Sequence, residues 1–130
     1  MLAVLAAAVT LGAAAASPMS YAFGRTGGNI VPFTITIAAS GAVAVTGPAH
    51  ATKARLGTRA MAALAAAVRT QRFFSLPRVV SCSGALPDFA SSFVTVRRRD
   101  TSRTVVVRGD CSARFTRVYT ALAAAVGMRP

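Results

Sequence analysis

The chain has 130 residues, 54% of them hydrophobic, a length that suits one domain and excludes two. Fourteen arginines and one lysine face three aspartates and no glutamate, for a formal net charge of +12. With one histidine, two cysteines and three scattered aspartates, neither a metal site nor a pair of catalytic carboxylates is expected, and no cofactor is predicted.

The first residues have the composition of a secretory signal. Residues 2–16 are mostly alanine, leucine and valine, and no charged residue occurs before Arg25. The stretch is shorter than the roughly 20 apolar residues of a membrane span, and Ala14 and Ala16 satisfy the small-x-small rule of signal peptidase. We predict a signal peptide over 1–16 and a secreted or envelope domain over 17–130, without a transmembrane span. The alternative, a buried alanine-rich helix, would lack the polar face of a surface helix.

Alternating patterns predict strands in the first part of the domain. Met19, Tyr21 and Phe23 alternate with small residues, which indicates a half-buried strand. Phenylalanine and isoleucine then alternate with threonine, and a Ser-Gly turn separates them from two valines. Residues 32–46 are therefore predicted to form a β-hairpin.

A loop and a helix are predicted next. Residues 48–57 are expected to be a loop, after which Thr58 caps a helix. Met61, Leu64 and Val68 share one face of this helix, which should end near Gln71.

The second half repeats the order of strands and helix. Residues 77–90 are predicted to be a long loop, and the valine-rich stretches 93–98 and 104–108 predict a second hairpin. Asp110 or Ser112 is expected to cap a last helix that ends at Gly127. The order is strand, strand, strand, helix, strand, strand, helix, which predicts an α+β fold. An antiparallel sheet of about five strands would carry both helices on one face.

Two cysteines in an exported chain usually pair, so we predict a disulfide between Cys82 and Cys111. The bridge would tie the long loop to the end of the second hairpin. The alternative is a cysteine hydrolase, because a helix N-terminus at Cys111 would favour the thiolate. Its base would have to be His50, which lies in a Gly/Pro/Ala loop with no carboxylate near it in sequence. Because exported thiols oxidise, the chain is predicted not to be an enzyme.

Two further segments could bind a partner. Arg25–Asn29 is a glycine-rich loop that lacks the Lys-Ser/Thr ending of a P-loop and precedes a strand, so a tight turn is predicted. A basic edge on the second hairpin would face an anionic cell-wall polymer or lipid. Its residues are Arg97, Arg98, Arg99, Arg103 and Arg108. Nucleic acid is not expected as a partner, because only Phe93 lies near these charges for base stacking.

The layout resembles the emfourin family of small bacterial inhibitors of thermolysin-like metalloproteases. The resemblance covers Tyr21 to Val126 and depends on the Tyr-Ala-Phe-Gly-Arg-Thr-Gly-Gly run, the Ser-Gly turn and the helix end Phe-Phe-Ser-Leu-Pro. The Cys-x-Gly-x-Leu-Pro-Asp loop at Cys82 to Asp88 and the Gly-x-Cys at Gly109 to Cys111 are closer still to small secreted actinobacterial proteins of unknown function.

The resemblance implies a secreted, non-enzymatic binding domain that inhibits a metalloprotease. By this analogy Arg25, Gly27, Gly28 and Asn29 are the first candidates for a contact surface. The cysteines and the signal depart from the emfourin pattern. Three hypotheses follow: an inhibitor, an envelope protein that binds anionic polymer or lipid through the basic edge, and an enzyme that uses Cys111.

Overall fold

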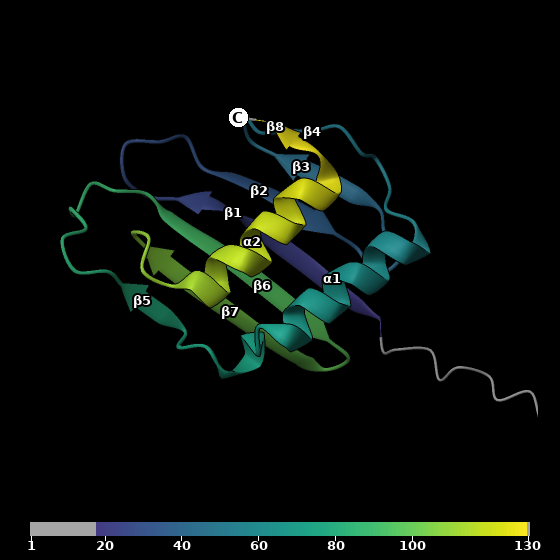
Figure 1. Cartoon of the computed structure of the whole chain (residues 1–130). Helices are drawn as coiled ribbons and strands as arrows, with labels where there is room; N and C mark the ends of the chain where they lie inside the picture. The colour runs from purple at the N-terminus through teal and green to yellow at the C-terminus, as the bar shows by residue number, and fades with distance from the viewer. Residues whose placement is uncertain (1–17, 130) are drawn as a thin grey trace, which may run out of the picture.

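The computed structural model describes residues 18–129. The signal peptide predicted over 1–16 lies outside these residues. In chain order the elements are β1 (Met19–Thr26), β2 (Phe33–Ile37), β3 (Val43–Thr46), β4 (His50–Ala51), α1 (Thr58–Thr70), the 3-10 helix η1 (Phe73–Ser75), β5 (Val79–Ser81), β6 (Ser91–Arg98), β7 (Thr101–Arg108), α2 (Ala113–Val126) and β8 (Met128–Arg129). Figure 1 shows their arrangement.

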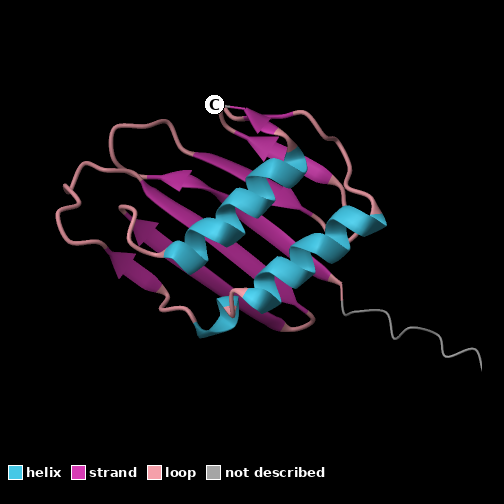
Figure 2. Cartoon of the chain, viewed as in Figure 1, coloured by secondary structure: helices cyan, strands magenta, loops and turns pink. Residues whose placement is uncertain are grey.

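Six of the strands form one sheet in the order β3-β2-β1-β6-β7-β5. Strand β1 pairs antiparallel with β2 on one side and with β6 on the other, so it joins the two predicted hairpins into one sheet. Both long helices lie side by side on one face of this sheet (Figure 2). The predicted α+β class and the two helices on one face are therefore confirmed.

Two segments that are expected to be loops contain short strands. Within residues 77–90, β5 pairs in parallel with β7, which makes the sheet mixed and gives it a sixth strand. Within residues 48–57, β4 pairs with β8. Strands of two or three residues are too short to show an alternating pattern, and both pairings join segments that are far apart in sequence.

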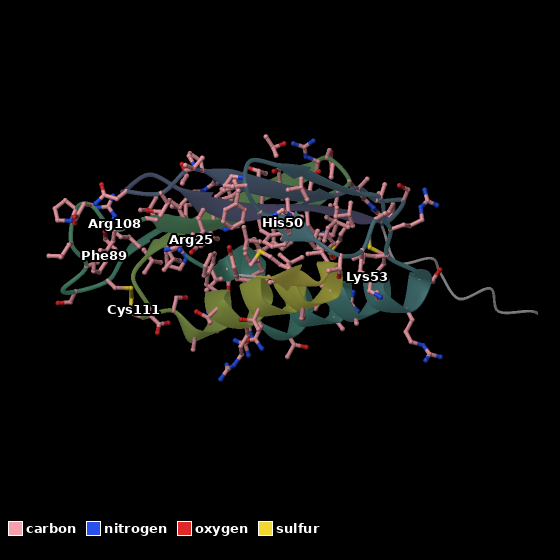
Figure 3. All side chains as sticks on the ribbon, turned by 90° about the horizontal axis from the view of Figure 1, so that it is seen from above. Arg25, His50, Lys53, Phe89, Arg108 and Cys111 are labelled. Atoms are coloured by element: carbon pink, nitrogen blue, oxygen red, sulfur yellow. A yellow bond between two sulfur atoms is a disulfide. The ribbon has the colours of Figure 1, made fainter. Side chains whose placement is uncertain are left out.

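Apolar side chains alternate along each long strand and gather on the face that the helices cover. Figure 3 shows the sheet and the helices edge-on as two layers. Tyr21 and Phe23 of β1 are buried there, and Val94 and Val96 of β6 lie beside them. The opposite face carries small and polar residues, among them Thr95 and Thr104, whose hydroxyl oxygens are 2.8 Å apart. The core is thus a single layer between sheet and helices.

The helices begin and end for different reasons. Gly57 is the N-cap of α1 and no side chain caps the helix there, so the prediction that Thr58 caps it is wrong. The N-cap of α2 is Ser112, whose hydroxyl accepts a hydrogen bond from the Phe115 amide at 3.4 Å, as predicted. Gly127 ends α2 in the left-handed region at φ 65°, a conformation that glycine adopts without steric cost. Among residues 18–129, neither helix has the length and apolarity to cross a bilayer.

Arg114 of α2 fastens the end of α1. Its guanidinium donates hydrogen bonds to the carbonyl oxygens of Gln71 and Arg72 and to the Ser75 hydroxyl, each at 2.7 Å. The last carbonyls of a helix have no partner within the helix, so this side chain satisfies them from a neighbouring element. The short segment that contains η1 is thereby held against α2.

Tyr21 gives the core a pH-dependent stability. Its hydroxyl is buried and has no hydrogen-bond partner among the described residues. Burial raises the pKa of Tyr21 from 10.0 to about 12, and Arg69 partly opposes this shift. The folded state therefore holds the phenolic proton more tightly than the unfolded chain, and stability falls as the pH rises from about 10 to about 12.

We expect Tyr21→Phe to keep or raise the stability at neutral pH, because an unsatisfied buried hydroxyl costs about 1–3 kcal/mol. The variant should also lose less stability than the wild type between neutral pH and about pH 11. Urea unfolding of both proteins at the two pH values measures this difference. An equal alkaline loss in both would show that Tyr21 does not cause it.

Candidate binding surface at the disulfide end

Cys82 and Cys111 form a disulfide, as predicted, with Cα atoms 5.7 Å apart. It joins the loop after β5 to the segment between β7 and α2, and the Cys82 amide also donates to the Arg108 carbonyl at 2.9 Å. Gly109 permits this approach, since a Cβ at that position would lie 2.6 Å from the Cys82 Cβ. Cys111 consequently has no thiol in this state, and the structure offers no support for a cysteine nucleophile.

The glycine-rich loop after β1 packs against the loop that precedes β6. A Cβ on Gly28, at φ 61°, would clash with the Asp88 carbonyl and lie 2.6 Å from the Ala90 amide nitrogen, so only glycine allows the two backbones to touch. The Asn29 amide donates to the Asp88 carboxylate at 3.4 Å. Sequence patterns predicted both loops but not the contact between them, because Asn29 and Asp88 lie 59 residues apart and no local pattern records a long-range contact.

Both loops expose apolar side chains, Val31 on the first and Leu86 and Phe89 on the second. Arg25, which the structure places in β1 rather than in the predicted loop, and Asn29 line a cleft with Phe89. We define the loop-pair surface by Arg25, Asn29, Val31, Leu86 and Phe89. The three apolar side chains are large and exposed, and Phe89 remains 48% exposed. Grouped exposed apolar side chains with polar neighbours are typical of a protein-contact surface.

A shallow cleft of about 520 Å³ lies between the loops. Its lining includes Arg25, Asn29, Asp88 and Phe89, and Figure 3 shows Arg25 and Phe89 at the same end of the molecule as Cys111. Arg25 also lies near Tyr119 of α2, where it partly opposes the rise in the pKa of Tyr119 that burial causes. The cleft thus has one cationic group and one carboxylate beside an exposed aromatic ring.

The structure brings together only part of the predicted basic edge. Arg97 and Arg98 end β6, and Arg99 follows in the turn at φ 54°. Arg103 turns toward the helices and donates to the Leu76 carbonyl. Arg108 lies at the far end of β7, opposite Ser91, with its Nε buried and without a partner among the described residues. Neighbouring strand residues point to opposite faces, which separates charges that are adjacent in sequence.

The other candidate chemistries find no assembled site. His50 lies on β4. Figure 3 shows it apart from Arg25 and Phe89 of the loop-pair surface. No group of three or more His, Cys, Asp or Glu side chains occurs within the part of the chain that the structure describes.

A pair of neighbouring glycines tests how the two loops are held together. Gly27 and Gly28 both have positive φ, but nothing lies within 4 Å of a Cβ on Gly27. We expect Gly27→Ala to cost about 1–2 kcal/mol from backbone strain alone and to leave the loops in contact. Gly28→Ala should cost more and shift the amide resonances of residues 88–90, because those backbone atoms must move. Similar spectra for the two variants would contradict the contact.

Comparison with protein-family models, curated proteins and solved structures finds no match. The resemblance to the emfourin family therefore remains a prediction. A proposal for the function of the loop-pair surface therefore depends on the residues that form it.

Proposed function

We propose that the protein is a small secreted, non-enzymatic binding domain that inhibits a thermolysin-like metalloprotease through the loop-pair surface. The observation that carries the proposal is the Gly28 contact, which joins the loop after β1 to the disulfide-linked loop before β6. The arrangement presents Phe89 and Leu86 on a pre-formed surface. Pre-formed loops lose little conformational freedom on binding, which favours affinity.

The chemistry of the surface suits a protein partner. Exposed aromatic side chains beside polar ones are common in protein interfaces, where buried aromatic residues contribute most of the binding energy. Arg25 and Asn29 supply polar groups on one side of Phe89. The resemblance to the emfourin family adds the class of partner, and by that analogy Arg25–Asn29 is the first candidate for the contact.

Inhibition also requires that the loops resist cleavage. A protease cuts a loop most readily when the backbone opens locally, and contacts that lower this opening slow cleavage. The disulfide and the contact between Gly28 and residues 88–90 both restrict such opening. The protein should therefore bind the protease without being turned over.

The experiment is a titration of a thermolysin-like metalloprotease with the purified, oxidised protein. We expect activity to fall linearly to a one-to-one end point, with the protein intact by mass at the end. No loss of activity at a large molar excess would overturn the proposal. Loss of activity that recovers as the protein is digested would show a substrate rather than an inhibitor.

A further inference from the structure

A second pocket lies at the opposite end of β6 and β7 from the disulfide, between the end of α1 and the β6–β7 turn. It has a volume of about 350 Å³. Its lining consists of Val68, Arg69, Arg72, Phe73, Phe74, Ser75 and Arg98. Three of these side chains are arginines, and none of the lining residues is acidic.

Arg98 lines one side of the pocket and stacks on an aromatic ring. Its guanidinium carbon lies 4.8 Å from the centroid of the Phe74 ring. A guanidinium that stacks on a ring uses its flat face, while its N–H groups point outward in its own plane. Arg98 is thus oriented by Phe74 and retains donors for another group.

The other two arginines, Arg69 and Arg72, lie where hydrogen bonds hold the backbone in place. Arg69 lies in the last turn of α1, and Arg72 follows it in the left-handed region at φ 49°. The Arg72 carbonyl accepts hydrogen bonds from Arg114 at 2.7 Å and from the Ser75 amide at 3.0 Å. These contacts hold the turn that carries Arg72, and all three arginines line the same pocket.

Three arginine residues and no acidic residue in the lining favour an anion as the ligand. Asp100 lines a separate pocket with Arg98, Arg99 and Thr101 and does not line this one. Arginine forks match the geometry of phosphate oxygens and donate paired hydrogen bonds to them. Val68 and the two phenylalanines provide apolar surface next to that position.

We propose that this pocket binds a phosphate group attached to an apolar or aromatic moiety. Arg69, Arg72 and Arg98 would hold the phosphate oxygens, and the moiety would lie against Phe74. The site is separate from the loop-pair surface and goes beyond the proposed inhibition. It differs from the predicted basic edge, because it joins Arg98 to α1 and the segment after it rather than to Arg103 and Arg108.

The test uses the oxidised protein in phosphate-free buffer, titrated with inorganic phosphate and then with phenyl phosphate. The arginine side-chain Nε–H resonances are followed by NMR. We expect saturable shifts at Arg69, Arg72 and Arg98, with phenyl phosphate binding about tenfold more tightly because its ring contacts Phe74. No saturable shift with either compound would overturn the proposal.

Matched variants separate a built site from general attraction to a basic protein. Arg98→Gln should weaken phenyl phosphate binding by about tenfold or more, since it removes charged hydrogen bonds. Arg59→Gln removes the same charge from the exposed start of α1 and should change the affinity less than about twofold. Equal weakening in the two variants would contradict the pocket. Phe74→Leu should reduce the preference for phenyl phosphate and, because Phe74 orients Arg98, should also weaken inorganic phosphate binding.

Vesicles identify the source of the phosphate. Co-sedimentation with vesicles of phosphatidylglycerol and phosphatidylcholine is compared for Arg98→Gln and Arg59→Gln. If Arg98→Gln alone loses binding, the pocket accepts a lipid headgroup. If both variants bind the vesicles alike while the phenyl phosphate result holds, the pocket accepts a soluble phosphate compound. Neither Arg98→Gln nor Phe74→Leu should alter protease inhibition, so the two proposals fail independently.

Discussion

Replacing both Cys82 and Cys111 with serine should lower the free energy of unfolding by about 3–4 kcal/mol. The two cysteines are separated by 29 positions in sequence, and a cross-link of this length removes much of the freedom of the unfolded chain. The free energy is measured by urea unfolding of the oxidised wild type and the double serine variant under the same conditions. A difference below about 1 kcal/mol would show that the bridge does not constrain the unfolded chain as described.

Loss of the disulfide should also loosen the loop that carries Leu86 and Phe89 of the loop-pair surface. Cys82 fixes one end of the loop that contains Leu86 and Phe89, and the Gly28 contact holds it near Asp88. Amide hydrogen exchange over residues 83–90 should therefore speed up more in the double serine variant than exchange in α1. Uniform acceleration across the chain would indicate a global effect without a specific role in the loops.

Replacing Phe23 with alanine should cost about 3–5 kcal/mol of unfolding free energy, because a large buried side chain is lost and the core fills the space only in part. Phe23 is 0% exposed in the central strand β1. Its ring contacts the Tyr119 ring of α2 edge to face, with centroids 5.5 Å apart. The residue thus joins the middle of the sheet to the helix layer.

Phe89 provides the control for this substitution. It is the same residue type but lies in a loop and is 48% exposed, so Phe89→Ala should change the unfolding free energy by less than about 1 kcal/mol. Urea unfolding of both variants at neutral pH makes the comparison. A similar cost at the two positions would mean that Phe23 does not lie at the centre of the core.

Local patterns were sufficient to predict most of the fold. The alternation in β1 and the apolar spacing in α2 each record one buried face, so strands, helices and their order could be predicted from sequence. Ser112 is a short polar residue before a helix, and its capping role was confirmed. The disulfide was predicted because only two cysteines exist to pair.

Features that depend on distant partners could not be predicted. Strand β5 exists because β7 lies beside it, and the two valines before Ser81 do not by themselves indicate parallel pairing. Likewise, nothing near Gly28 in sequence shows that Asp88 lies against it. The pocket proposed to bind phosphate is of the same kind, since Arg69 and Arg98 belong to different elements and line one pocket only in the folded chain.

The proposed contact between the loop-pair surface and a metalloprotease is tested most directly by comparing two exposed apolar residues. Phe89→Ser alters that surface, whereas Val45→Ser alters β3, which lies at the edge of the sheet beyond β2. The inhibition constant of each variant is measured against a thermolysin-like metalloprotease. We expect Phe89→Ser to weaken inhibition by about tenfold or more and Val45→Ser to inhibit like the wild type. Equal inhibition by both variants, or a larger loss in Val45→Ser, would contradict it.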